Sequence, residues 1–252
     1  MKRVVITGAG TVNPLGQNLD QTLAAMKAGR CAIGPLDIPD LDRLSIKIGA
    51  QVTDWKPENH FEKGHLSLLD RHVQFALVSA RQAMAQAGLR PDPERTAVIM
   101  GTGGGGLITS DEAYRAVYAE GKSRVHPFTV PRLMHSAAAS HISMEMGLMG
   151  PTFSVSSACA SSNHAIGLAV QMLRAGAADV ALAGGSEAML SFGGLKAWEG
   201  LRVMSPDACR PFSVGRNGMV QGEGAAVFVL EDREAALARG VDRRQALHRL
   251  TQ

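Results

Sequence analysis

The sequence has few of the features that mark secreted, membrane-spanning or nucleic-acid-binding proteins. It contains only three cysteines, Cys31, Cys159 and Cys209, whose spacing fits neither a disulfide framework nor a metal site. No apolar run is long enough to cross a bilayer. The formal net charge of +3 is too small to indicate nucleic-acid binding. We therefore expect no metal, no membrane and no nucleic acid among its partners.

The first residues also lack a secretory signal. Residues 1–7 (MKRVVIT) lead directly into a strand pattern, without an apolar core region or a small-residue cleavage site. A reducing cytoplasm is the compartment that we expect. The 252 residues, 45% of them hydrophobic and 19% charged, suit a globular protein with a buried core, arranged as one large domain or two small ones.

Apolar strand patterns alternate with helical patterns along the chain. The strands are short, nearly continuous apolar runs, which is typical of a sheet covered on both faces. The alternation predicts an α/β layered fold. Strands are predicted at residues 4–7, 96–100, 152–156, 178–183 and 224–231, and helices at 18–28, 66–87, 111–120, 134–146 and 161–175.

Two glycine motifs invite a nucleotide-binding interpretation, and both are incomplete. Gly8 and Gly10 follow a strand, but Asn13 stands where the third glycine of a dinucleotide fingerprint belongs. We expect a tight turn there, packed close to other main chain. The run at residues 101–106 (GTGGGG) lacks the lysine of a phosphate loop, and close approach of the main chain to a ligand or a neighbouring strand is the preferred interpretation.

Cys159 is the candidate nucleophile. It lies between the predicted strand 152–156 and the predicted helix 161–175, among small neighbours. The first N–H groups of a helix lack partners and its dipole is positive there, so a thiolate is stabilised, and the thiolate is the reactive form. The alternative is a cysteine that only fills space, because free cysteines are among the most buried residues.

The helix that follows Cys159 has apolar residues on nearly every face. A helix of this kind is expected to be buried all round, as an inner layer between two sheets. The chain provides strands for only one well-formed sheet. These apolar residues are Ala165, Ile166, Leu168, Ala169, Val170, Met172 and Leu173.

Several motifs together resemble the β-ketoacyl-acyl-carrier-protein synthases of the elongating type II kind, in the thiolase-like superfamily. The resemblance covers residues 2–240, and the segment around Cys159 is its most specific part. The motifs are 4–10 (VVITGAG), 69–71 (LDR) with Gln74, 101–103 (GTG), 157–167 (SACASSNHAIG), 183–187 (AGGSE), 210–212 (RPF) and 222–225 (GEGA).

The resemblance implies a thiolase-like α/β/α/β/α architecture, of which this chain carries mainly the N-terminal half. It implies extension of an acyl chain by decarboxylative condensation, in fatty acid or polyketide synthesis. No cofactor is expected, since phosphopantetheine arrives on the acyl carrier protein that brings the acyl and malonyl thioesters. The expected partners are that carrier protein and a second copy or a complementing C-terminal half.

By matching position, Cys159 resembles the nucleophile that accepts the acyl chain. Gly104 and Trp198 fall where the family lines its acyl pocket, and the small Gly104 suggests a wider pocket. Arg202 resembles a basic surface position that meets the acidic carrier protein, although a solvated surface charge explains it equally well.

The chain also departs from the family pattern. The family's two catalytic histidines and its lysine belong to a C-terminal half, and no histidine here has the matching context; Gly64-His65 lies in the wrong region. We therefore expect a synthase domain at residues 1–240, a divergent tail at 241–252 and an incomplete protein that is inactive alone. Ser213, Asn217 and Met219 replace common family residues and resemble a specialised branch that includes nodulation-type synthases.

Three other functions remain as alternatives. A non-catalytic partner subunit of a condensing enzyme would usually lack the cysteine, so Cys159 disfavours it. A nicotinamide-dependent oxidoreductase is disfavoured by the incomplete glycine fingerprint. A thiolase proper would share the fold but differ around the cysteine.

Overall fold

Helices and strands alternate along the chain in the computed structural model, which describes residues 2–241. The strands are β1 (Val4–Val12), β2 (Gly34–Pro35), β3 (Ile48–Gly49), β4 (Thr96–Gly101), β5 (Thr152–Val155), β6 (Val180–Glu187) and β7 (Gly224–Asp232). The α-helices are α1 (Leu19–Lys27), α2 (Lys63–Leu66), α3 (Arg71–Ala87), α4 (Leu107–Tyr114), α5 (Thr129–Leu133), α6 (Ala137–Met146), α7 (Ser161–Ala175), α8 (Phe192–Gly200) and α9 (Arg233–Ala238). Short 3-10 turns are η1 (Leu41–Arg43), η2 (Pro57–Asn59) and η3 (Pro93–Arg95), and η4 (Arg115–Ala119) is π-helical.

Five strands form one mixed sheet in the order β1-β7-β6-β4-β5. Strands β4, β5 and β6 are parallel, and β7 runs antiparallel to both β6 and β1. Val98 of β4 pairs with Thr152 on one side and Leu182 on the other. The carboxyl ends of β4, β5 and β6 therefore meet at one edge of the sheet, where open α/β sheets bind their ligands.

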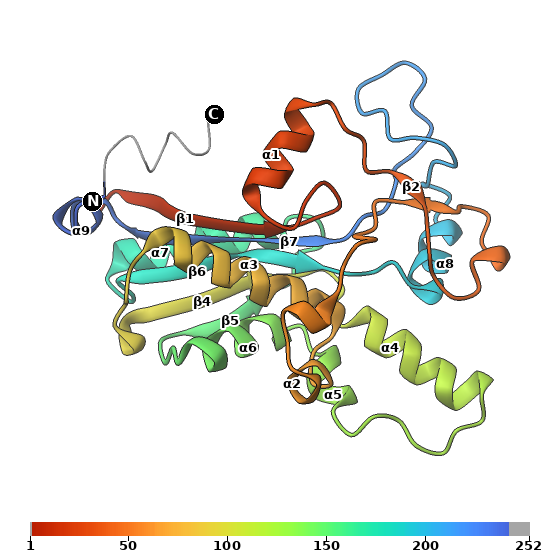
Figure 1. The fold of residues 1–252 in the computed structure, drawn as a ribbon, viewed down its shortest axis with the longest axis horizontal. Helices are drawn as coiled ribbons and strands as arrows, with labels where there is room; N and C mark the ends of the chain where they lie inside the picture. The colour runs from red at the N-terminus through yellow and green to blue at the C-terminus, as the bar shows by residue number, and fades with distance from the viewer. Residues whose placement is uncertain (1, 242–252) are drawn as a thin grey trace.

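Helices cover both faces of this sheet, so the predicted α/β class is confirmed (Figure 1). Helices α3 and α6 pack on one face and α7 on the other. Successive residues of β4 alternate between the two cores: Val98 and Met100 belong to the α3 side, and Ala97 and Ile99 to the α7 side. This is the period of two that a strand imposes on its side chains.

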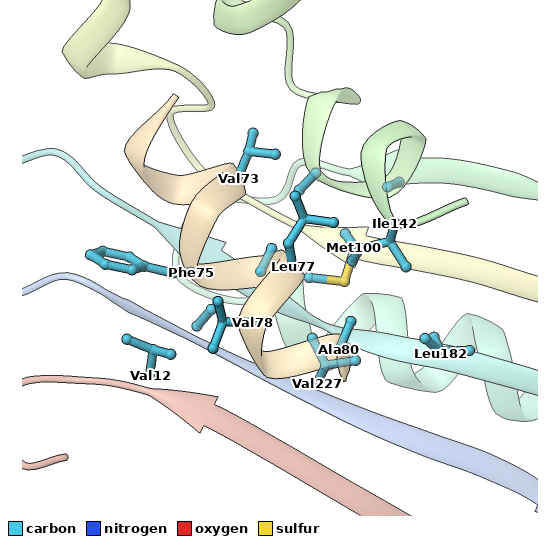
Figure 2. Packing of buried hydrophobic residues seen from close by; sticks show 14 of the residues in the cluster. Val12, Val73, Phe75, Leu77, Val78, Ala80, Met100, Ile142, Leu182 and Val227 are labelled. Atoms are coloured by element: carbon cyan, nitrogen blue, oxygen red, sulfur yellow. The ribbon is translucent and has the colours of Figure 1, made fainter. Parts of the chain in front are cut away.

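The larger core lies beneath α3. Figure 2 shows Leu77 of α3 beside Met100 of β4 and Ile142 of α6, with Leu182 and Val227 below. Leu77, Ile142 and Val227 are fully buried, and each such side chain contributes about 1.5–3 kcal/mol by leaving water. None of the helices within residues 2–241 combines the length and the apolarity needed to cross a membrane.

The predicted helix 66–87 begins later than expected, at Arg71, and Leu66 is the last residue of the separate helix α2. A break separates α2 from α3, because Asp70 takes an extended conformation and caps α3 by accepting a hydrogen bond from the His72 N–H. The helix ends as predicted at Gly88, whose φ of 60° is left-handed. Helix α4 starts at Leu107, directly after the glycine run and earlier than predicted. Pro131, which falls between the predicted helices 111–120 and 134–146, lies within α5.

Gly8 and Gly10 lie within β1, so the predicted tight turn at these glycines is wrong. Their predicted close packing is present: a Cβ at Gly8 would lie 2.1 Å from the carbonyl oxygen of Ala83, and one at Gly10 would lie 2.0 Å from that of Ser79. Both carbonyls belong to α3. The glycines therefore let α3 lie directly on the edge strand.

A second close approach positions the turn that carries Cys159. A Cβ at Gly101, the last residue of β4, would lie 2.4 Å from the main-chain carbonyl carbon of Ser161. A Cβ at Gly185 of β6 would lie 2.7 Å from Cβ of Ser162. The first turn of α7 thus packs on main chain of both strands.

Helix α7 is buried on one face only. Ala165, Ala169 and Leu173 are buried against the sheet, whereas His164 and Leu168 are exposed. The expectation of a helix buried all round is therefore not met by residues 2–241, which contain one large sheet and the small β2-β3 ribbon. The predicted tail at 241–252 lies outside the described residues, except for Val241.

Histidines gather where α2, α3 and α6 meet. The ring centroids of His65 and His141 are 6.2 Å apart. Burial lowers the pKa of His141, His65 and His72 lower it further, and only Glu145 raises it. Burial and the nearby Arg81 lower the pKa of His60. Protonation of either ring is thus less favourable in the folded chain than in the unfolded one.

These histidines make stability depend on pH. Because the folded pKa of His141 lies below the unfolded value of about 6.5, the unfolded chain binds more protons between the two values. We expect the melting temperature to be highest above pH 6.5 and to fall as the pH drops through the folded pKa, by about 2–4 °C for each kcal/mol lost. His141→Gln should flatten this dependence in thermal melts from pH 7.5 to pH 5. An unchanged slope would exclude His141 as its source.

Gly101→Ala tests the contact between β4 and α7. The added methyl would overlap main chain that cannot rotate away, so we expect a loss of about 1–3 kcal/mol, as for other overpacked sites. Gly34→Ala is the matched control, since a Cβ there meets nothing within 4 Å. Urea unfolding of both variants measures the difference, and equal stabilities would contradict the close contact.

Candidate active site

The turn between β5 and α7 presents Cys159 to solvent. Ala158, just before it, has a φ of 49°, which is uncommon for a residue with a side chain. Ser161 holds this turn: its hydroxyl accepts from the Ser157 N–H at 2.8 Å and donates to the Ala158 carbonyl at 2.7 Å. The strained turn therefore projects Cys159 away from the sheet, as in strand-nucleophile-helix elbows.

The start of α7 supplies positive potential next to Cys159. Ala160 is the N-cap, and no side chain caps the helix. The N–H groups of Ala160 and Ser161 donate to the carbonyls of Ser157 and Ala158, both at 3.1 Å, and the helix dipole favours negative charge at this position. The prediction that Cys159 lies at a helix N-terminus among small residues is confirmed.

A cleft of about 910 Å³ opens beside Cys159. It lies at the carboxyl ends of the parallel strands, and segments distant in sequence line it. They include the end of β1, residues 101–104 of the glycine-rich segment, the Cys159 turn, the ends of β6 and α8, and the start of β7. Apolar side chains on its walls include Leu107, Ile166, Met189, Trp198, Met219 and Phe228.

Three of the four predicted site residues line this cleft, and the fourth does not. Cys159, Gly104 and Trp198 all lie on its wall. Arg202 is exposed beyond the end of α8, with a left-handed φ of 55°, and is not among the lining residues. The position of Arg202 on the surface is compatible with a docking contact and equally with a solvated charge.

The side chain of Leu107 occupies the space beside Gly104. A Cβ built at Gly104 would lie only 2.4 Å from Cδ1 of Leu107. The extra room expected from the small Gly104 is therefore filled, in this structure, by the first residue of α4. Sequence spacing alone gave no indication that residues 104 and 107 compete for the same volume.

Glu187 and Thr102 are functional candidates that the sequence reasoning missed. Glu187 ends β6 and lines the cleft, and its Oε2 accepts hydrogen bonds from the N–H groups of Gly103 at 2.7 Å and Gly104 at 3.1 Å. Thr102 donates to the same carboxylate at 3.4 Å and accepts from the Gly105 N–H at 3.0 Å. Glu187 belongs to the AGGSE motif, which is part of the family resemblance, but the sequence alone assigns no role to its carboxylate.

A buried ion pair supports the cleft at the start of β7, where Gly224 pairs with Glu187. Arg71 binds Glu223 through two nitrogen atoms, at 2.6 and 2.8 Å, and Glu223 also accepts from the Val52 N–H at 2.9 Å. The side chain of Glu223 is 1% exposed, so breaking this pair would leave a buried, unpaired charge. The pair joins two of the sequence motifs, LDR and GEGA.

No group of three or more potential metal ligands occurs within residues 2–241. The acidic side chains of the cleft, Glu187 and Glu223, are occupied by main-chain amides and by Arg71. No histidine or lysine is among the described residues that line the cleft.

Comparison with known proteins identifies relatives of the chain. Residues 1–236 match the family model described as "Beta-ketoacyl synthase, N-terminal domain". The chain is 47% identical over 242 residues to nodulation protein E of Rhizobium leguminosarum bv. trifolii. It is 34% identical over 249 residues to 3-oxoacyl-[acyl-carrier-protein] synthase 2 of Staphylococcus aureus (strain COL). These alignments cover 95% and 96% of this chain but 60% of each relative.

The fold has a close counterpart among solved structures. The ishigamide ketosynthase/chain length factor structure superposes with a TM-score of 0.89 at 28% identity. The superposition covers 96% of this chain and 61% of that chain. The chain thus has the arrangement of the N-terminal part of a ketosynthase, and it spans about three fifths of the length of the relatives that it matches.

The exposure of all three cysteines makes a direct comparison of their reactivity feasible. Because Cys159 alone among them adjoins the N-terminus of a long helix and lines the cleft, we expect limiting iodoacetamide at neutral pH to label it first. Peptide mapping by mass spectrometry measures the order, and Cys31 and Cys209 are internal controls. Faster labelling of either control would contradict the assignment of Cys159.

Proposed function

Because this chain belongs to the β-ketoacyl synthase family, as an N-terminal domain of that family, we propose that it provides the acyl-accepting part of a condensing enzyme that extends acyl chains. The proposal rests on the position of Cys159, which is exposed on a strained turn at the start of α7 and faces a cleft with apolar walls. A thiol placed in this way has access to a thioester, and the cleft has room for the acyl chain.

In the proposed reaction, the sulfur of Cys159 attacks the carbonyl of an acyl-carrier-protein thioester. A new thioester forms on Cys159, and the carrier protein leaves with its free thiol. Malonyl-carrier protein then loses carbon dioxide, and the resulting carbanion attacks the acyl carbonyl on Cys159. The carbon–carbon bond forms, the cysteine sulfur leaves, and a 3-oxoacyl-carrier protein two carbons longer is released. Phosphopantetheine enters only as the arm of the carrier protein.

The second step needs hydrogen-bond donors near the developing negative charge on the malonyl thioester. Removing one such preorganised donor typically slows an enzyme by a factor of about 100–1,000. The described cleft lining contains no histidine or lysine. We therefore propose that the donors come from residues matching the part of its relatives that this chain does not span.

For the carrier protein, we propose docking near Arg202, at the exposed end of α8. Trp198 of the same helix lines the cleft, so a carrier bound there would be close to the mouth of the acyl pocket. The name of the Staphylococcus aureus relative refers to an acyl carrier protein, which supports this class of partner.

Of the two edges of the sheet, the β5 edge is the more open to pairing with a second chain. At the β1 edge, Gln86 and Gln82 of α3 accept hydrogen bonds from the Ala9 and Thr11 N–H groups. Edge β5 has no such covering side chains within the described residues, and Phe153 on it is 37% exposed. Since an unpaired edge readily pairs with another strand, we propose a dimer through β5.

A non-catalytic partner subunit is the second candidate function. It is favoured by one observation, that a structural neighbour is described as a ketosynthase together with a chain length factor. Cys159 argues against it, because a partner that performs no acyl transfer needs no reactive thiol. Transfer of a radiolabelled acyl group from carrier protein to Cys159 would decide for the first candidate.

We expect the chain by itself to accept an acyl group but not to condense it. After incubation with acyl-carrier protein, mass spectrometry of the purified chain should show an acyl group on Cys159. The Cys159→Ser variant should form no such thioester. With malonyl-carrier protein added, 3-oxoacyl product should form more slowly than with a complete synthase by at least the factor of about 100 expected for one lost donor.

Product formation at the rate of a complete synthase would contradict the expected incompleteness. A single monodisperse monomer in light scattering would contradict the proposed pairing at β5. Neither result depends on the other, because catalysis and assembly are measured separately.

A further inference from the structure

Glu187 is bound by main-chain amides and has no basic partner. Its Oε2 accepts from the N–H groups of Gly103 and Gly104, and Thr102 adds a longer hydrogen bond. Glu187 takes part in none of the ion pairs found within residues 2–241. The buried glutamates Glu223 and Glu231, in contrast, pair with Arg71 and Arg239. Hydrogen bonds to an ionised acceptor are stronger than neutral ones, so Glu187 is well suited to fix two flexible residues.

The segment that Glu187 binds is intrinsically variable in conformation. Residues 103–106 are four consecutive glycines, which can adopt left-handed as well as right-handed main-chain angles. Gly105 has a φ of 62°. Without outside contacts such a segment has many accessible conformations. The contacts therefore determine where its main chain lies.

This glycine segment forms a wall of the cleft next to the nucleophile. Gly103 and Gly104 line the cleft together with Cys159 and Ala158. A Cβ at Gly103 would be 3.1 Å from Oε2 of Glu187 and 3.8 Å from the carbonyl oxygen of Ala158. At Gly104 a Cβ would meet Leu107 on one side and Oε1 of Glu187, at 3.3 Å, on the other. The carboxylate thus contacts the glycine wall at Gly103, the residue of that wall that lies beside Ala158 of the Cys159 turn.

We propose that Glu187 is a positioning residue: it holds the main chain of Gly103 and Gly104 as the wall along which the acyl chain lies when bound to Cys159. This inference rests on the proposed acyl transfer to Cys159. The carboxylate of Glu187, at the end of β6, then helps to determine which acyl lengths are accepted, together with the side chains that face the acyl chain.

Glu187→Gln is the direct test. Glutamine has nearly the same shape, but it replaces one acceptor oxygen by an NH₂ group that can only donate, so the two glycine N–H groups lose an ionised acceptor. Butyryl-, octanoyl- and palmitoyl-carrier protein are compared as donors of acyl groups to Cys159, by mass spectrometry. Iodoacetamide is the control reagent: it alkylates Cys159 but carries no acyl chain that would lie along the glycine wall.

We expect Glu187→Gln to slow acylation by the longest accepted donor on the order of tenfold. Acylation by the butyryl donor should change less, and the iodoacetamide rate should be unchanged. Thr102→Val, which removes the hydroxyl between Glu187 and Gly105, should give a smaller change with the same length dependence. If Glu187→Gln folds poorly, Thr102→Val provides the same comparison of donor lengths in its place.

Glu199→Gln is the control for a carboxylate that binds main chain outside the cleft; unlike Glu187, Glu199 also pairs with Lys196 at 2.9 Å. Glu199 also accepts two main-chain N–H groups, from Ser45 at 2.5 Å and Ile46 at 2.8 Å, but it does not line the cleft. Its replacement should leave the order of donors unchanged. Hydrogen exchange supplies a readout independent of acylation: the amides of Gly103 and Gly104 should exchange faster in Glu187→Gln than in the parent chain and the control.

Two results would overturn the inference. One is an equal loss of rate for all donors and for iodoacetamide, which would indicate general damage to the Cys159 turn. The other is an unchanged length profile with unchanged amide exchange. If the parent chain itself reacts with iodoacetamide but with none of the thioesters, the proposed function fails, and the inference about Glu187 fails with it; this outcome is recognised without any variant.

Discussion

The contact between the first turn of α7 and the ends of β4 and β6 is the constraint on which the site depends. Gly101 and Gly185 have no Cβ, and main chain of Ser161 and Cβ of Ser162 occupy the space where those atoms would be. The helix can therefore begin directly above the sheet. Its N-terminus and Cys159 are brought to the carboxyl ends of the parallel strands, where the cleft opens.

A second constraint acts on the glycine-rich segment, which is held at both ends. Beyond its end, Thr109 of α4 donates to the carboxylate of Asp70 through its N–H at 2.9 Å and its hydroxyl at 2.6 Å. Burial alone raises the pKa of Asp70, but hydrogen bonds from His72 and Thr109 outweigh this and hold the pKa below its usual value. Asp70 thus stays an acceptor, and it links the start of α3 to the start of α4.

The sequence motifs are distant along the chain but adjacent in the structure. Arg71 of the LDR motif pairs with Glu223 of the GEGA motif, and Glu187 of the AGGSE motif binds the glycine run. The resemblance to the family is therefore carried by residues that hold one another in place around a single cleft. These contacts fix the positions of Cys159 and of the cleft walls. This is the physical reason why the motifs are specific to the family.

The elements governed by local signals were predicted well. Helix α7 was placed at its observed bounds, because small residues and a C-terminal glycine delimit it. The strand predicted at 96–100 ends one residue before β4 does. The length of β1 and the break before α3 could not be predicted, since the first depends on glycines packed against α3 and the second on the cap at Asp70. The role of Leu107 and Glu187 is likewise tertiary: each acts on main chain that only the fold brings near.

The pairing of β1 with β7 bears on how this chain is made. Val4 pairs with Asp232, and the register continues to Val12 opposite Ala225. Strand β1 therefore cannot find its place in the sheet until β7 has left the ribosome. At about 5–20 residues per second, the first strand waits roughly 10–50 s for its partner during synthesis. The glutamines that cover its outer edge in the finished sheet lie in α3, which emerges much earlier. Helix α3 can therefore cover that outer edge during the interval, while the edge that pairs with β7 still lacks its partner.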